Sequence, residues 1–270
     1  DFCAKEIEPY AAEWDETGEF PYETIKKMAD AGLYSVHFPE KYGGSGDELS
    51  FIIVVEEISR GSAGLANSYL VSLGLGMYPI LMHGSEQQKN HYIPRVIKGN
   101  TVAFGLTEAM AGSDVAALDA KYTQEGDYYV LNGNKIFISN GADADFITTF
   151  ATKDKSLGYR GVSAFVVDKG APGFSVGKIE RKMGLNPDSV TELIFDNCKI
   201  PLANMIGEEG RGFRVALEAI DASRVSIAAL SIGVAQAAFD AAVAYAKERR
   251  QFGAEIARLQ AIQWMIADMA

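Results

Sequence analysis

The sequence predicts a multi-domain α+β protein: an N-terminal α-helical domain over residues 1–102, a middle antiparallel β-barrel domain over 103–206, and the start of a C-terminal four-helix-bundle domain over 207–270. Three observations predict this order. Helix-capping residues and helical periodicity fill the first hundred residues. Short strand-like runs separated by Gly, Pro and Asp follow, and helical periodicity returns from Phe213 onward.

Turn and capping residues mark the helices of the first domain. Pro21 suits a helix start and Gly32 a helix stop, so we expect a helix over 22–31. A further helical run begins at Leu49. The segment 85–88 reads Ser-Glu-Gln-Gln, which has the capping-box form and predicts a helix start, with the helix ending near residue 99.

An uncharged stretch, Gly61–Met82, is long enough to raise the question of a membrane span. It contains several glycines, three serines, Asn67 and Pro79, whereas lipid-spanning helices are more uniformly apolar. We therefore predict a buried helix here and no membrane span.

The middle domain is predicted from short strand-like runs. Asn132-Gly133, between Tyr128–Leu131 and Lys135–Ser139, is the strongest short hairpin signal in the chain. The further runs are Phe146–Ala151, Val162–Val167, Phe174–Ile179 and Thr191–Phe195. No helix-length periodic run interrupts them, so a small antiparallel barrel or sandwich is expected.

The last segment predicts one long helix and the start of another. Ser223–Arg250 is rich in Ala and would be about 42 Å long, with Gly253 ending it. A final run carries Leu259, Ile262 and Ile266 at helical spacing and shows no stop signal before Ala270. We expect further residues beyond 270 to pack on this apolar face, the alternative being that an oligomer covers it.

Composition excludes several classes of function. A formal net charge of −11 argues against nucleic acid as the main partner, and it requires local donors for any anionic ligand. Two lone cysteines favour a reducing intracellular compartment. The three histidines have no metal-ligand spacing, and the Rossmann, Walker and nucleophile-elbow patterns are absent, so no metal site is predicted.

The stretch Ala103–Asp114 is dense in small and polar residues. Small residues let the backbone approach a flat ligand, and Thr107 and Ser113 add hydroxyls. Successive backbone amides in such a loop can form a nest that binds an anion or a carbonyl. Considered alone, the stretch fits a polar loop between domains somewhat better than a ligand site.

This stretch resembles a signature of the acyl-CoA dehydrogenase family, Thr-Glu-Pro-x-x-Gly-Ser-Asp, with Ala109 in place of the usual Pro. Other matching stretches occur in the family's order and spacing, so the resemblance covers essentially the whole chain. They are Pro39–Gly46, Asn132-Gly133, Phe137–Gly141, Asp221–Arg224 and Arg249–Gly253.

The resemblance implies FAD as cofactor and assigns residues to it. The flavin-lining residues it implies are Phe104, Leu106, Thr107, Gly112, Ser113, Phe137, Ile138 and Ser139. Phe137 and Ser139 stand where the family usually has Trp and Thr. The resemblance implies that the aromatic side chain of Phe137 packs on the flavin ring and that the hydroxyl of Ser139 bonds to the N5 atom of that ring. We expect Thr107, Ser113, Phe137 and Ser139 to converge on one cleft; the alternative is an ordinary strand with Phe137 in the core.

A second group of residues is implied to reach the FAD of a neighbouring subunit: Arg249, Phe252 and Gln260. A guanidinium pairs bidentately with a pyrophosphate, which suits Arg249 to this role. The alternative is solvated charge at a helix end. The resemblance implies a homotetramer, a dimer of dimers.

The resemblance places Ser113, Asp221 and Arg224 along the acyl-CoA substrate, whereas Asp221 and Arg224 alone fit an exposed ion pair. Most of the family has its catalytic Glu beyond residue 270, and a minority has it one residue before this arginine, which is Ser223 here. No catalytic residue is therefore assigned within the chain. Glu108 is expected to be structural.

The function implied is FAD-dependent α,β-dehydrogenation of a short or medium straight-chain acyl-CoA to the trans-2-enoyl-CoA, with electrons passed to an electron-transferring flavoprotein. The expected location is the cytoplasm of a bacterium or the mitochondrial matrix of a eukaryote. An acyl-CoA oxidase or flavin monooxygenase of the same fold, or a non-catalytic assembly factor built on it, are the alternatives.

Overall fold

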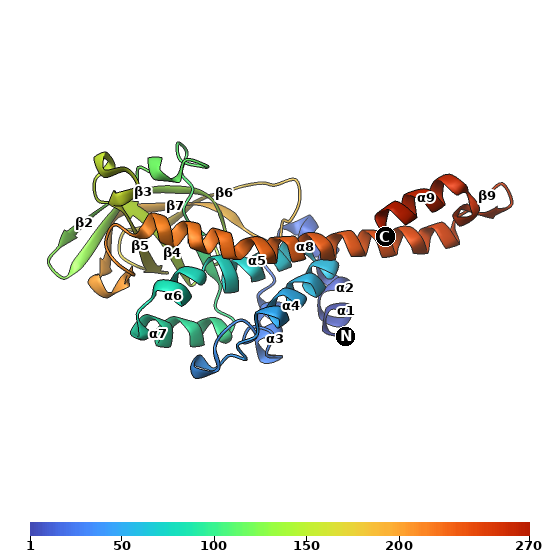
Figure 1. Cartoon of the computed structure of the whole chain (residues 1–270), viewed down its shortest axis with the longest axis horizontal. Helices are drawn as coiled ribbons and strands as arrows, with labels where there is room; N and C mark the ends of the chain where they lie inside the picture. Colours follow the sequence, from blue (N-terminus) through green and yellow to red (C-terminus); the bar gives the residue numbers. More distant parts are fainter.

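The computed structural model describes all 270 residues and shows a helical part, a β part and a long helix that passes both (Figure 1). The first part contains seven α-helices and one π-helical turn. They are α1 (Phe2–Glu6), α2 (Glu8–Thr17), α3 (Tyr22–Asp30), α4 (Glu48–Gly61), α5 (Ala63–Leu70), the turn η2 (Val71–Leu75), α6 (Tyr78–His83) and α7 (Glu86–Ile97).

The helix starts of the first part follow from local hydrogen bonds. The predicted capping box is present at α7, where the Gln88 backbone N–H donates to Ser85 Oγ (3.1 Å) and the Ser85 N–H donates to Gln88 Oε1 (2.9 Å). Asp47 caps α4 by accepting from the Leu49 N–H at 3.0 Å. The helical interpretation of this domain is confirmed.

Two segments are long and apolar enough to cross a membrane by length and composition alone, Ala63–His83 and Gly212–Glu248. In the most apolar window of the first, 78% of the residues are buried inside the protein, as predicted for a core helix. In the corresponding stretch of the second, 11% are buried, so this apolar part of the helix is largely not covered by the rest of the chain.

The β part is one sheet in the order β6-β7-β3-β2-β4-β5-β8, with β1 beside β4. The strands are β1 (Val102–Gly105), β2 (Lys121–Glu125), β3 (Tyr128–Ser139), β4 (Phe146–Thr152), β5 (Val162–Asp168), β6 (Phe174–Ile179), β7 (Val190–Pro201) and β8 (Met205–Ile206). The β character is confirmed. The prediction of antiparallel pairing throughout was incomplete, because β1 and β2 run parallel to β4. The long connection 106–145 provides the crossover that the parallel β1–β4 pair needs.

The hairpin predicted at Asn132-Gly133 is wrong. Both residues lie inside β3, where the pairing with β7 shifts register between Leu131 and Gly133. Gly133 has φ 141° and a Cβ there would lie 2.7 Å from Ala120 Cα, so the glycine serves a bulge and not a turn. The actual turn is 126–127, a Gly-Asp pair that joins β2 to β3 and suits a two-residue loop equally well.

Helix α8 (Gly212–Glu248) is about 55 Å long and packs against α4, α5 and β5. Gly233 lets it approach α4, since a Cβ there would collide with Glu56 O and Ser59 Oγ. The helix ends at Glu248, earlier than predicted. Phe252-Gly253 is instead the turn between β9 (Arg250–Gln251) and β10 (Ala254–Glu255), and α9 (Gln260–Met269) then folds back along α8 (Figure 1).

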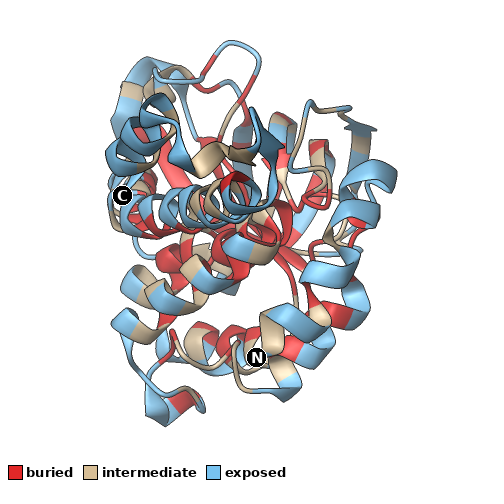
Figure 2. Ribbon diagram, turned by 90° about the vertical axis from the view of Figure 1, so that its right-hand side faces the viewer, coloured by how far each residue is buried: buried red, intermediate tan, exposed pale blue.

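Buried residues concentrate where the helices, the sheet and the first half of α8 meet, while the far end of α8 is exposed (Figure 2). The larger core cluster joins side chains of the helical part to β1, β4, β5 and α8, and a smaller one fills the inside of the β part. This junction positions the candidate active site.

Candidate active site

A small apolar cavity of about 230 Å³ lies at the junction of the helical part, the sheet and α8. Its lining residues come from η2, from β1 and the loop after it, from the end of β3, and from α8. They are Val71, Leu75, Phe104, Leu106, Thr107, Phe137, Ile138, Ser139 and Ile220. Three of the four residues expected to converge do so: Thr107, Phe137 and Ser139. Ser113 is exposed on the loop and does not line the cavity.

The loop after β1 is held in place by its own backbone. The Glu108 N–H donates to Ala111 O (3.0 Å) and the Ala111 N–H donates to Glu108 O (3.2 Å), which closes a tight turn. The Ile136 N–H donates to Thr107 O at 2.9 Å and fixes the loop to β3. Gly112 is exposed beyond this turn, like Ser113.

A buried ion pair lies behind this loop. Lys135 Nζ is 2.7 Å from Glu108 Oε1, with the two side chains 0% and 7% exposed. The Glu108 carboxylate also accepts from the Ala120 N–H, and Lys135 donates to Leu106 O at 3.3 Å. Burial lowers the pKa of Lys135, and the Glu108 charge opposes that shift. Glu108 is structural, as expected; Lys135 was missed, because a lysine in an alternating strand is normally a solvent-facing residue.

Phe137 has a strained backbone and a largely exposed ring. In the β3–β7 ladder, Lys135 pairs with Leu193 and Ile138 with Thr191, so two residues bulge opposite one. The φ of Phe137 is 57°, in the left-handed region, which costs a non-glycine residue about 1–3 kcal/mol. The residue is 63% exposed, so the core interpretation is wrong for Phe137. Such strain beside a cavity is typical of functional sites.

Ser139 is hydrogen-bonded to two residues that do not line the cavity. Its Oγ donates to Asp188 Oδ2 (2.8 Å), and Asn67 Nδ2 donates to the same carboxylate oxygen (2.7 Å). Asp188 is 2% exposed, and burial raises its pKa. Sequence reasoning did not find Asp188 or Asn67. The first lies in a Pro-containing segment that looks like an ordinary turn, and the second inside an apolar helix.

Helix α8 contributes Ile220 to the cavity and no acid or base. Asp221 and Arg224 form an exposed ion pair at 3.3 Å on this helix. Ser223 is buried, and its hydroxyl donates to Ile220 O at 2.8 Å. The cavity lining therefore contains no carboxylate and no histidine.

Arg249, Phe252 and Gln260 lie far from the cavity of their own chain. All three are exposed, and they follow the distal end of α8, well away from the sheet (Figure 1). Arg249 comes 29 residues after Ile220, about 44 Å along a helix. These side chains can contact a ligand in such a cavity only if the cavity belongs to another chain.

Comparison with known proteins gives the family. Models of the N-terminal, middle and C-terminal domains of acyl-CoA dehydrogenase match residues 1–100, 103–198 and 210–270. The chain belongs to the acyl-CoA dehydrogenase family. Members of this family are FAD-dependent oxidoreductases.

Several relatives of this acyl-CoA dehydrogenase chain are close. The short-chain specific acyl-CoA dehydrogenase of Clostridium acetobutylicum is 46% identical over 100% of the chain, which spans 72% of that relative. The acryloyl-CoA reductase (NADH) of Anaerotignum propionicum is 44% identical, again over 100% of the chain and 69% of the relative. The solved butyryl-CoA dehydrogenase from Megasphaera elsdenii superposes with a TM-score of 0.96 at 41% identity, covering 100% of this chain and 72% of that one.

Proposed function

We propose that the apolar cavity receives the reactive edge of the flavin ring of FAD, and that the protein oxidises the Cα–Cβ bond of a short or medium straight-chain acyl-CoA to the trans-2-enoyl-CoA. The observation that carries the proposal is the meeting of Thr107, Phe137 and Ser139 at one apolar cavity. Thr107 is at least 30 positions away from the other two in sequence, and only the folded chain brings them together.

The residues present fit a planar ring. A cavity of about 230 Å³ is smaller than the roughly 300–1,000 Å³ of a complete ligand pocket, so it suits one edge of the cofactor. The exposed Phe137 ring offers a face for stacking, Thr107 and Ser139 offer hydroxyls to the ring edge, and the aliphatic lining excludes water. FAD supplies the hydride-accepting chemistry, and the chain orients and shields it.

The proposed flavin position also suggests where the substrate binds. Ser113, Asp221 and Arg224 are exposed near the elements that form the cavity, where they can contact the acyl-CoA. The base that removes the α-proton is a carboxylate outside residues 1–270. Electrons leave through an electron-transferring flavoprotein, the active assembly is a homotetramer, and the location is the bacterial cytoplasm, in keeping with the bacterial relatives.

One relative favours a second candidate, the reverse reaction. The acryloyl-CoA reductase (NADH) is nearly as similar as the short-chain specific dehydrogenase, at 44% against 46% identity. The same site would then hold an enoyl-CoA. Reduction of the bound flavin by NADH through a partner flavoprotein, followed by its reoxidation with acryloyl-CoA, would favour this direction.

Replacing Phe137 with Gly tests the flavin position. We expect the affinity for FAD to fall about 2- to 10-fold, because an aromatic contact of this kind contributes about 0.5–1.5 kcal/mol. The free energy of unfolding should not fall, since Gly relieves the left-handed φ and the ring is largely exposed. FAD fluorescence titration and urea unfolding give the two quantities.

Leu185→Gly is the matched control. Leu185 also has a left-handed φ (54°) and is exposed, but it does not line the cavity. Its replacement should leave the FAD affinity unchanged. Equal FAD affinity in the Phe137→Gly variant and the original chain would place the flavin elsewhere.

A further inference from the structure

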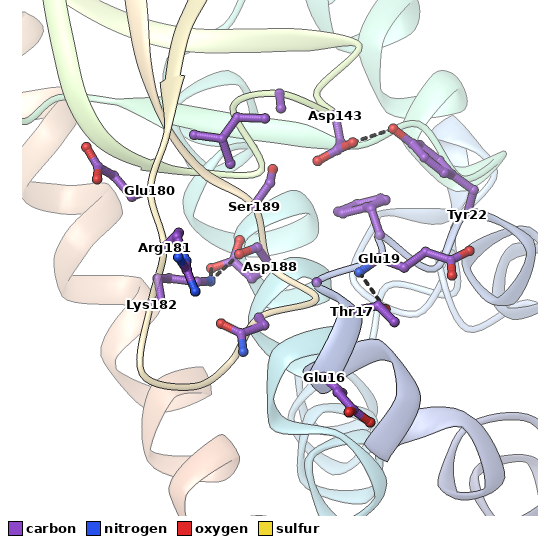
Figure 3. Close-up of a pocket in the computed structure, with 15 residues that line it drawn as sticks. Glu16, Thr17, Glu19, Tyr22, Asp143, Glu180, Arg181, Lys182, Asp188 and Ser189 are labelled. Carbon is purple, nitrogen blue, oxygen red and sulfur yellow. Dashed lines mark hydrogen bonds and ion pairs between the residues drawn. The ribbon is translucent and has the colours of Figure 1, made fainter.

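Asp188 links two cavities of different character. One of them, about 650 Å³, is a polar cleft whose lining includes Asp143, Lys182, Asp188 and Ser189 (Figure 3). Asp188 also accepts a hydrogen bond from Ser139, which lines the apolar cavity, whereas Asp188 itself does not. The Asp188 side chain is 3% exposed, so this carboxylate is buried beside a residue of the apolar cavity.

The hydrogen bonds of Asp188 fix the direction of the Ser139 hydroxyl. An ionised carboxylate has no hydrogen to donate, so Ser139 Oγ must donate to Asp188 Oδ2 across their 2.8 Å separation. The Asn140 backbone N–H donates to the other oxygen, Oδ1, at 3.1 Å. Lys182 Nζ lies 3.8 Å from Oδ2 and stabilises the ionised form, which opposes the effect of burial.

The oxygen of Ser139 keeps its acceptor capacity. Asn67 Nδ2 is 3.4 Å from Ser139 Oγ and donates weakly to one lone pair. A hydroxyl oxygen has two lone pairs, so the second is available to a ligand in the apolar cavity. With its hydrogen committed to Asp188, Ser139 can accept a hydrogen bond from that ligand but cannot donate one.

We propose that Asp188 is a positioning residue that turns the Ser139 hydrogen away from the apolar cavity, so that Ser139 stabilises a ligand N–H in preference to a bare ring nitrogen. This inference rests on the proposed function, in which Ser139 faces N5 of the flavin. Reduced flavin carries a hydrogen on N5 and oxidised flavin does not. In this orientation the Ser139 hydroxyl stabilises the reduced flavin more than the oxidised flavin, and it therefore raises the midpoint potential of the bound flavin.

The charge of Asp188 acts in the opposite direction, and the two effects must be separated. A nearby negative charge disfavours added electrons, so its removal raises the midpoint potential. Asp188→Asn removes the charge and also offers an amide N–H to Ser139, which frees the hydroxyl hydrogen for the cavity. In a Ser139→Ala background only the charge effect remains.

The experiment is a double-mutant cycle on the midpoint potential of the FAD-loaded protein, measured by anaerobic equilibration with a reference dye. We expect the Asp188→Asn shift to be more negative with Ser139 present than in the Ser139→Ala background. The expected difference is a tenfold change in the equilibrium constant, about 30 mV for a two-electron couple. Equal shifts in the two backgrounds would overturn the inference.

Asp143→Asn is the matched control, because Asp143 lines the same polar cleft but bonds to the Tyr22 hydroxyl (Figure 3). Its shift should be the same in both backgrounds. Should Asp188→Asn fail to fold, Asn67→Ala decides in the same two backgrounds. Its lost hydrogen bond to Asp188 changes the charge effect in both, whereas the freed lone pair of Ser139 matters only when Ser139 is present. The shift in midpoint potential should therefore be more positive with Ser139 than with Ser139→Ala, and an equal or more negative shift contradicts the inference. Failure of the original chain to bind FAD would instead refute the proposed function.

Discussion

Replacing Glu108 with Gln should lower the free energy of unfolding by about 3–5 kcal/mol, because it leaves the Lys135 charge buried without a counter-charge. Lys135 is completely buried, and Glu108 is the one carboxylate within 4.0 Å of its ammonium group. The same change loosens the loop that carries Thr107, so FAD retention should fall with stability. Urea unfolding followed by circular dichroism measures the first effect.

Two further variants test whether the buried charge causes the loss of stability in Glu108→Gln. Glu6→Gln breaks an exposed pair with Lys27 of similar length (2.6 Å) and should leave the unfolding midpoint unchanged. The double variant Glu108→Gln with Lys135→Met removes both charges and should recover much of the lost stability. A Glu108→Gln variant as stable as Glu6→Gln would show that the ion pair does not hold the loop.

Replacing Arg249 with Ala should weaken FAD binding by about 10- to 100-fold, since a hydrogen bond to a charged group contributes about 1.5–3 kcal/mol. Arg250 pairs with Glu255 at 3.7 Å, whereas Arg249 has no carboxylate partner in its own chain and is free to contact a phosphate. FAD fluorescence titration of the variant and of the original chain gives the ratio.

The position of Arg249 also predicts that the FAD affinity depends on the protein concentration. If Arg249 binds the FAD of another chain, as proposed, the apparent FAD affinity of the original protein should increase with protein concentration as chains associate. Arg258→Ala, an exposed arginine in the same segment, is the control and should bind FAD normally. An affinity independent of protein concentration, with equal values for both variants, would place Arg249 outside the FAD site.

Local signals in the sequence predicted local structure well. The capping box at Ser85 and the buried apolar stretch were readable because each depends on residues close in sequence. The turn was misplaced because Asn132-Gly133 carries a stronger local hairpin signal than Gly126-Asp127, and only the pairing of β3 with β2 and β7 shows that the chain turns at Gly126-Asp127. The domain order was predictable because the hydrophobic pattern changes from helical to strand-like and back to helical along the chain.

The candidate site was predictable only in part. Thr107, Phe137 and Ser139 came from the resemblance, but the reason that Phe137 projects into the site, a bulge with a left-handed backbone, depends on its partner strand. Lys135 and Asp188 were missed because their burial and their pairing with Glu108 and Ser139 arise from contacts 27 and 49 residues apart in sequence. No periodic pattern encodes such contacts.

The most direct test of the account is the anaerobic addition of butyryl-CoA to the FAD-loaded chain, followed by flavin absorbance. The account predicts a perturbed flavin spectrum, because substrate and ring share one site. It also predicts bleaching at least about 100-fold slower than in the Clostridium acetobutylicum relative measured alongside, because no base lines the cavity. An unchanged spectrum would contradict the shared site, and bleaching at the relative's rate would show that a base lies within residues 1–270.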